Sequence, residues 1–93
     1  MAKISKNSRI TLVSEVIWRK VENEAVILNL ETDKYYTLNL QGTDIWAMCG
    51  SKKTVKEIIS KMTAKYNVKE AQLLNDVIKL TKEWEKEGLV KVF

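Results

Sequence analysis

The stretch that determines the predicted fold runs from Val26 to Trp46 and reads VILNLETDKYYTLNLQGTDIW. Its first residues alternate in the manner of a β-strand. The polar residues 31–34 predict a tight turn, and residues 35–38 predict a strand that returns antiparallel. Asn39 then suits the N-cap of a helix, because its side-chain oxygen can accept a free N–H of the first turn. The apolar residues that share one face of the first strand are Val26, Leu28 and Leu30.

Further elements are predicted on both sides of this stretch. Upstream, the chain is strand-like from Ile10, and residues 22–24 predict a hairpin turn into the next strand. Downstream, apolar residues recur at helical spacing and predict three successive helices. The expected helices cover about residues 40–48, 55–67 and 70–87, and residues 89–93 are typical of a short closing strand. We therefore predict an α+β, winged-helix-like fold, with three N-terminal antiparallel strands followed by three helices.

Local capping signals define the helix boundaries. Thr54 and Glu57 have the spacing of a capping box, in which each side chain accepts the other residue's backbone N–H. Gly88 suits the left-handed position after the third helix, because glycine adopts positive φ without steric cost. Lys69 stands at the start of that helix and offers no side-chain acceptor, so we expect this start to be weaker by about 1 kcal/mol.

Length and composition predict one domain. The chain has 93 residues and is 45% hydrophobic, which is enough for a modest core. Residues 1–9 are polar and basic, and we expect them to be flexible, with residues 10–93 forming the domain. No stretch approaches the roughly 20 apolar residues of a transmembrane helix, and the N-terminus does not resemble a signal peptide. A single cysteine, Cys49, cannot form an internal disulfide, so these features together predict a cytoplasmic protein.

Residues that enzymes commonly use for catalysis are scarce. The sequence has no histidine and one cysteine, which removes the commonest general base and any thiolate cluster. Its three glycines are isolated and form no phosphate-binding loop. We interpret the carboxylates of the helical segments as solvated surface charge rather than as an acid–base pair or a cation site. We therefore expect no catalytic activity, no metal and no cofactor.

A net charge of +4 is compatible with nucleic-acid binding. The last helix, which is the best candidate for a recognition helix, is nevertheless acidic by two and would repel phosphates. Its charged residues are Lys79, Lys82 and Lys86 against Glu70, Asp76, Glu83, Glu85 and Glu87. A winged-helix DNA-binding protein is thus the alternative interpretation, with weak nonspecific binding through the basic face of the second helix. That face carries Lys56, Lys61 and Lys65.

The third predicted strand would form an open edge of the sheet. In the strand order one-two-three its N–H and C=O groups are unpaired on one side and can template another chain. Edge strands are usually protected from pairing by proline or by charged side chains. Residues 35–37 contain neither. We expect Tyr36 and Leu38 to point inward, and Tyr35 and Thr37 to point outward.

The third helix has an apolar arc that is wider than a small core requires. Its core stripe comprises Leu73, Val77, Leu80 and Trp84, and Leu74, Ile78 and Thr81 extend the arc. A helix buried on two sides would account for Leu74 equally well, whereas Ile78, near Lys82, is the better groove residue. We expect an added strand to contact residues 35–38. Pockets from Leu74, Ile78 and Thr81 would receive its side chains, and Lys79 and Lys82 would attract its carboxylates.

The stretch from Leu28 to Trp46 resembles the family of the pyrroloquinoline quinone (PQQ) biosynthesis protein D, PqqD. The matching residues are Leu28, Asn29, Glu31, Thr32, Tyr35, Tyr36, Leu38, Asn39, Gly42, Ile45 and Trp46. The resemblance implies the recognition-element fold of ribosomally synthesised peptide (RiPP) pathways. It further implies that the domain binds the leader segment of a precursor peptide between the third strand and the third helix.

The resemblance and the residues together predict a non-catalytic peptide-recognition domain. The implied partners are a precursor peptide and a modifying enzyme to which the leader is presented. That enzyme is a radical S-adenosylmethionine enzyme, as in PQQ biosynthesis, or a leader peptidase, as in lasso-peptide pathways. Besides DNA binding, a third interpretation is a structural subunit or a dimer joined through the open edge strand.

Overall fold

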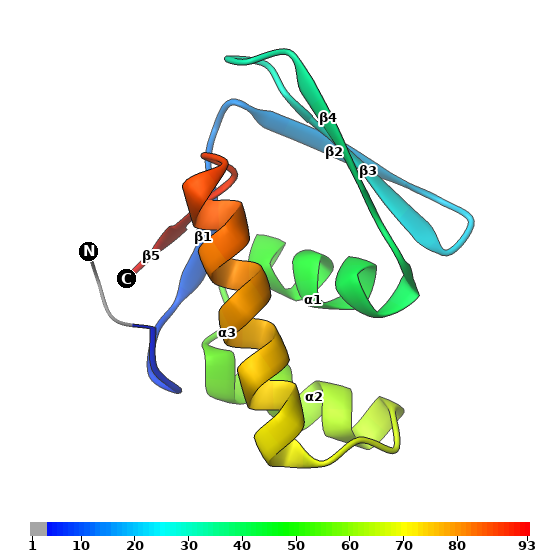
Figure 1. Ribbon diagram of the computed structural model, residues 1–93, viewed down its shortest axis with the longest axis vertical. Coiled ribbons are helices and arrows are strands. Elements are labelled where there is room, and N and C mark those ends of the chain that lie inside the picture. The colour runs from blue at the N-terminus through cyan, green and yellow to red at the C-terminus, as the bar shows by residue number, and fades with distance from the viewer. Residues whose placement is uncertain (1–3) are drawn as a thin grey trace.

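The computed structural model describes residues 4–93. Within them, three helices and two antiparallel sheets are arranged as Figure 1 shows. The strands are β1 (Ile10–Leu12), β2 (Val16–Val21), β3 (Glu24–Asn29), β4 (Lys34–Leu38) and β5 (Val90–Val92). The helices are α1 (Leu40–Gly50), α2 (Val55–Lys65) and α3 (Glu70–Lys86). None of these helices is long and apolar enough to cross a membrane.

The strands form two separate sheets. β2, β3 and β4 make a three-stranded sheet in that order, and β1 pairs with β5 in a two-stranded sheet. The predicted α+β fold, with a three-stranded sheet followed by three helices, is confirmed, and so is the closing strand near the C-terminus. The sequence predicted one strand-like region from Ile10, whereas the chain turns between β1 and β2. There the N–H of Val16 donates to the carbonyl of Val13 at 3.3 Å.

The three-stranded sheet packs one face against the helices. Trp18 of β2 and Tyr36 of β4 both pair with Ile27 of β3, so these three side chains share the inner face. The buried residues of β3 are Ala25, Ile27 and Asn29, and Val26 and Leu28 alternate with them on the outer face. The predicted alternation is therefore present, but the buried face is that of Ala25, Ile27 and Asn29, and the apolar face noted in the sequence, with Val26 and Leu28, is the outer one.

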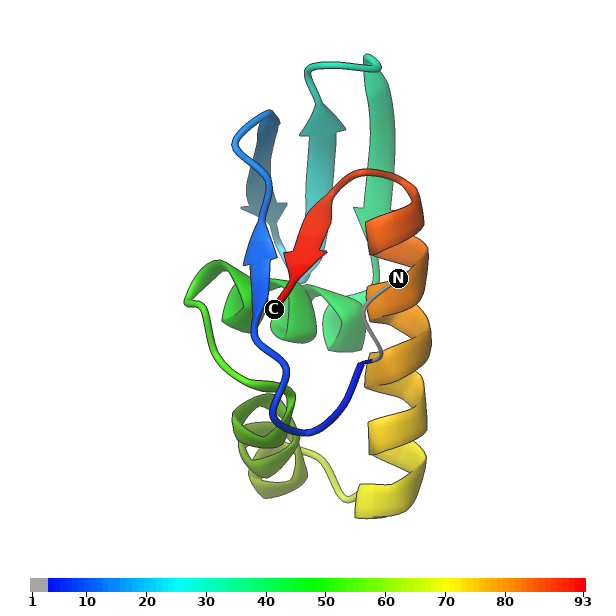
Figure 2. The ribbon, with the colours of Figure 1, turned by 90° about the vertical axis from the view of Figure 1, so that its left-hand side faces the viewer.

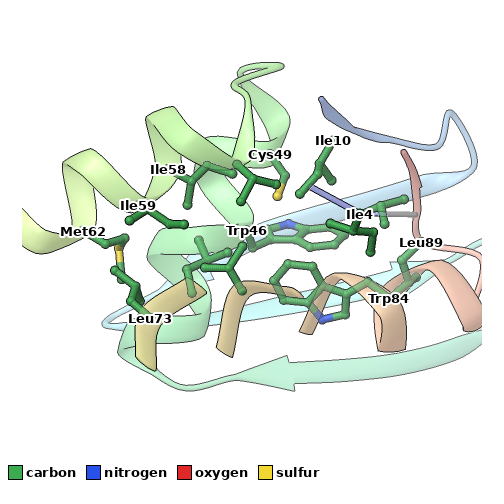
Figure 3. Close-up of a cluster of buried hydrophobic side chains, with 14 of the residues drawn as sticks. Ile4, Ile10, Trp46, Cys49, Ile58, Ile59, Met62, Leu73, Trp84 and Leu89 are labelled. Carbon is green, nitrogen blue, oxygen red and sulfur yellow. The ribbon is translucent and has the colours of Figure 1, made fainter. Parts of the chain in front are cut away.

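Trp46 of α1 lies at the centre of the core and is fully buried. Its ring makes edge-to-face pairs with Trp18 of β2 and Trp84 of α3, with ring centroids 6.4 and 5.1 Å away. This geometry is favourable because it directs the positive edge of one ring at the negative face of the other. Figure 3 shows Trp46 and Trp84 among aliphatic residues that come from all three helices. One side chain therefore joins the sheet, α1 and α3.

Residues 4–9 pack onto the helices, which differs from the flexible segment expected from the sequence. Ile4 is 6% exposed and belongs to the hydrophobic core. The backbone carbonyls of Lys6 and Ser8 accept N–H groups from the first turn of α2, each at 2.9 Å. The N–H groups in the first turn of a helix have no acceptor within that helix. The hydrogen bonds that they donate to Lys6 and Ser8 therefore hold the N-terminal segment in place. Residues 1–3 of the segment expected to be flexible lie outside the described residues.

The helix caps stand where the sequence predicts them. Asn39 Oδ1 accepts an N–H of the first turn of α1 at 2.9 Å, and Thr54 and Glu57 form the reciprocal capping box of α2. Gly88 follows α3 with φ of +73°. Lys69 makes no side-chain cap at the start of α3, as expected. The helix ends differ from their predicted positions by less than one turn.

Asp44 ties α1 to the end of α2. Its carboxylate accepts hydrogen bonds from Lys65 Nζ at 2.8 Å and from the Tyr66 hydroxyl at 2.5 Å. Partial burial raises the pKa of Asp44, but the two hydrogen bonds and the charge of Lys65 outweigh this effect and leave the pKa below its usual value. The same hydrogen bonds raise the pKa of Lys65 and of Tyr66, because the carboxylate favours the protonated form of both.

The buried position of Ile4 predicts that Ile4→Ala lowers the free energy of unfolding by about 2 kcal/mol, because apolar contacts are lost and a cavity remains. Urea unfolding followed by tryptophan fluorescence measures this change. Asn7→Ala, at an exposed position of the same segment, is the matched control and should change stability by less than about 0.5 kcal/mol. Negligible effects of both substitutions would show that the segment does not contribute to the core.

Asp44→Asn should cost about 1 kcal/mol at neutral pH, because a charged acceptor becomes neutral beside a lysine that is half exposed. Folding lowers the pKa of Asp44, so its contribution is present above the unfolded-state pKa and is lost as pH falls through the lower folded-state value. The difference between wild type and variant should therefore vanish in solutions well below pH 3.8, the ordinary pKa.

Chemical denaturation from neutral to strongly acidic pH measures this dependence. Asp33→Asn, in the exposed turn between β3 and β4, makes the same chemical change without these partners and serves as control. A difference between wild type and Asp44→Asn that did not change with pH would contradict the role assigned to the carboxylate.

Candidate functional site

β4 forms an edge of the three-stranded sheet, and among residues 4–93 only β3 pairs with it. Consecutive residues of an antiparallel pair direct their N–H and C=O groups alternately toward and away from the partner strand. The two-residue loop between β2 and β3 closes on the hydrogen-bonded pair Val21 and Glu24. Alternation from that pair leaves the backbone groups of Tyr35 and Thr37 directed away from β3. These groups can bond to a further strand.

The side chains of β4 alternate as predicted. Tyr36 and Leu38 are half-buried on the face toward the helices, and Thr37 is exposed between them. Tyr35 is 70% exposed and lies on the outer face, where it lines a shallow apolar hollow with Ile17. A strand added to β4 would therefore have Tyr36 and Leu38 as neighbours on the side of the helices.

A groove of about 420 Å³ lies between the C-terminal end of β4, the first turns of α1 and one flank of α3. In Figure 2, the C-terminal end of β4 comes down to the level of the C-terminal turns of α3. Gly42 of α1 also lines this groove, and a Cβ added there would lie 3.2 Å from Asn39 Oδ1 and would narrow the space. The apolar lining comprises Leu38, Ile45 and Leu80, and the polar lining comprises Thr37, Asn39, Gln41, Asp76, Lys79 and Glu83.

The flank of α3 that lines the groove is not the one expected from the sequence. Of the expected helix residues only Lys79 lines it, and Leu80, expected in the core stripe, provides its apolar contact. Leu74 and Ile78 are half-buried against the core instead. At 100° per residue, Ile78 and the exposed Lys82 each lie about 160° around the helix from Leu80. The expectation that Leu74, Ile78 and Lys82 face β4 is therefore wrong.

Thr81 is likewise a core residue and not a groove residue. It is fully buried, and its hydroxyl donates to the carbonyl of Val77 at 2.7 Å. The apolar arc of α3 has two margins, and the helix sequence alone does not indicate which margin faces β4. The signal that sequence reasoning missed is the pair of carboxylates, Asp76 and Glu83, that stand beside Leu80 on the groove flank.

A contact between β4 and the end of α3 lies next to the groove. Tyr36 Oη donates to Glu87 Oε2 at 2.8 Å, across 51 residues of sequence. This hydrogen bond raises the pKa of Tyr36, because loss of the proton would place two negative charges side by side. Asn29 Nδ2 donates to the carbonyl of Glu87 at 3.4 Å. The two contacts fix the spacing between the sheet and α3 at that end.

The charge of the groove lining is acidic. Its charged residues are two carboxylates, Asp76 and Glu83, and one lysine, Lys79. The sequence instead predicted that Lys79 and Lys82 would attract the carboxylates of a ligand, and Lys82 does not line the groove. Among residues 4–93, no group of three or more histidine, cysteine, aspartate or glutamate side chains is placed to hold a metal. Burial raises the pKa of the Cys49 thiol to about 12, which leaves it protonated and unreactive at neutral pH. The chemistry that the groove offers is the binding of an extended chain.

Comparison with known proteins identifies similar domains. The family model for coenzyme PQQ synthesis protein D (PqqD) matches residues 24–90. A solved structure of TbiB1 in complex with the TbiA(beta) leader peptide has a TM-score of 0.80 and 26% identity, over 85% of this chain and 93% of that one. Lasso peptide synthetase B1 complexed with the leader peptide has a TM-score of 0.81 over 88% and 96% of the two chains, and its 17% identity shows the shared fold alone. A search of curated proteins gives no significant match.

Proposed function

The chain belongs to the PqqD family, and we propose that it recognises the leader segment of a ribosomally synthesised precursor peptide without catalysing a reaction. The observation that carries this proposal is the groove beside the open edge of β4. A leader in extended conformation would add a strand to the sheet through the backbone groups of Tyr35 and Thr37. Its groove-side residues would contact Tyr36, Leu38 and Leu80.

The likeness to the TbiB1 structure supports this proposal, because that chain shares 26% of its residues with this one and was solved with a leader peptide. Five of the residues expected from the sequence remain in the proposed site, and three from the groove flank of α3 join them. Of the expected ones, Thr37, Leu38 and Lys79 line the groove, and Tyr35 and Tyr36 belong to the adjoining edge strand β4. The added ones are Asp76, Leu80 and Glu83.

We further propose that the chain presents its bound leader to a separate modifying enzyme. A chain without histidine, whose one thiol is buried, has little means of modifying a peptide itself. A radical S-adenosylmethionine enzyme and a leader peptidase are the two partners that we expect. DNA binding is the weaker alternative, because Asp76 and Glu83 on the open flank of α3 would meet phosphates with repulsion.

Leu80→Ala should weaken leader binding about tenfold or more, because the ligand buries part of this side chain and full burial of a leucine is worth about 1.5–3 kcal/mol. Calorimetric titration with a synthetic leader from a neighbouring precursor gene measures the affinity. Ile78→Ala removes a similar aliphatic side chain from the opposite flank of the same helix, and it should lower stability without lowering affinity. Equal loss of affinity in both variants would contradict the position of the groove.

Thr37→Pro should lower leader affinity about tenfold while the free domain stays folded, because proline removes an N–H that is directed at the open edge. One hydrogen bond of roughly 1 kcal/mol and a disturbed strand end account for this loss. Thr37→Ala keeps the N–H and is the control, with affinity close to wild type. Thermal melts separate binding from folding, and unfolding of Thr37→Pro would show that this N–H bonds to β3 instead.

A further inference from the structure

The side of the groove formed by α3 carries several carboxylates, and the addition of a peptide strand to β4 does not by itself require them. Asp76 and Glu83 line the groove, and Glu87 stands one helical turn beyond Glu83, where it accepts the Tyr36 hydroxyl. Lys79 is the one cation of this lining. None of the three carboxylates has a cationic partner among residues 4–93. The ion pairs found there are Lys6–Glu70 and Lys65–Asp44.

This local charge runs against that of the whole chain, which is +4. A peptide rich in carboxylates would be attracted by the whole molecule and repelled where it has to bind. A peptide with a basic side chain in the groove would instead find carboxylates on the wall of α3. The acidic side chains of the groove therefore affect which peptide sequence binds, whereas the positive charge of the whole chain affects how strongly charged peptides are attracted to the molecule.

The side chains that would face an added strand lie at two levels along β4. The level of Leu38 is that of the groove itself, whose apolar lining is Leu38, Ile45 and Leu80 and whose lining from α3 also includes Glu83. At the level of Tyr36, just outside the groove lining, the Tyr36 hydroxyl donates to Glu87 of α3, and Glu83 of the lining lies one helical turn before Glu87. Two residues of β4 separate the levels, so they lie about 7 Å apart along the strand.

An added strand would present alternate side chains to these two levels. Its residues rise by about 3.3 Å each and point in turn to the groove and away from it. A side chain at the Leu38 level and the next one on the same face, at the Tyr36 level, are therefore two positions apart in the ligand. This relation holds whether the strand is added parallel or antiparallel to β4.

We propose that the groove selects leader segments in which a lysine or arginine stands two positions from a large apolar residue. The apolar side chain fills the level of Leu38 and Leu80, and the basic side chain lays its alkyl stem along the groove and pairs its charge with Glu83 and Glu87. This inference rests on the proposed function and specifies the ligand that the site takes. Lys79, on the rim, can turn its flexible chain to solvent.

The test is selection of a random 12-residue peptide display library on the immobilised full chain. Selections on Thr37→Pro identify peptides that bind outside the groove, and these are discarded. Among the remaining peptides, lysine and arginine should be enriched at least about threefold two positions from leucine, isoleucine, valine or an aromatic residue. Glu83→Lys should abolish this enrichment or replace it by enrichment of aspartate and glutamate.

Glu85→Lys is the matched control, because it makes the same charge change on the same helix at a residue outside the groove lining. It should keep the preference for lysine and arginine. Affinity of a selected peptide for wild type should fall with added salt, and so should its advantage over the version with glutamine in place of the basic residue. Thermal melts of each variant establish that it is folded.

The outcomes distinguish failure of this inference from failure of the proposed leader recognition. Groove-dependent peptides without a basic preference would overturn the inference and leave leader binding by strand addition intact. A preference that Glu83→Lys does not alter would also overturn it. If no peptide from the library depended on the groove, strand addition itself would be wrong, and the inference would be wrong with it.

Discussion

The structure depends on the contact of Trp46 with Trp18 and Trp84. These three rings come from α1, β2 and α3, and Trp46 is fully buried between the other two. Loss of a buried tryptophan side chain typically costs about 3–5 kcal/mol, a large part of the roughly 5–15 kcal/mol that stabilises a domain. Its indole N–H finds no acceptor within residues 4–93, which is unfavourable when the group is buried. The apolar burial and the two edge-to-face pairs must therefore outweigh that cost.

Because the tryptophan contact holds α3 against the sheet, the groove exists before any ligand arrives. The hydrogen bond from Tyr36 to Glu87 adds a second connection between the sheet and α3, and Gly42 lines the groove without a Cβ that would crowd Asn39 and Leu38. Ordering a loop or side chain on binding costs free energy, so a groove that is already formed retains more of the contact energy as affinity. The same residues that stabilise the fold thus prepare the site.

Local signals in the sequence predicted most of the fold, and tertiary relations decided the rest. Asn39 and Gly88 mark helix ends because the capping interaction is made within a few residues of each. An apolar arc on a helix has two margins, and the sequence does not show which margin faces the sheet. The sequence therefore indicates Ile78 as the groove residue, whereas in the structure Leu80 lines the groove. The packing of Ile4 was missed for a similar reason, because its partners lie on helices that are distant in sequence.

The acidic wall of the groove also bears on self-association through the open edge of β4. Pairing of two β4 edges in a dimer would bring the Asp76 and Glu83 side chains of both copies toward one shared seam, and like charges placed opposite one another are destabilising. A second folded copy would in addition have to fit its own sheet beside α3. A single extended peptide meets neither obstacle, since it is one strand wide and carries charges of its own. Repulsion between these carboxylates would therefore oppose the pairing of two β4 edges more than the addition of a single peptide strand.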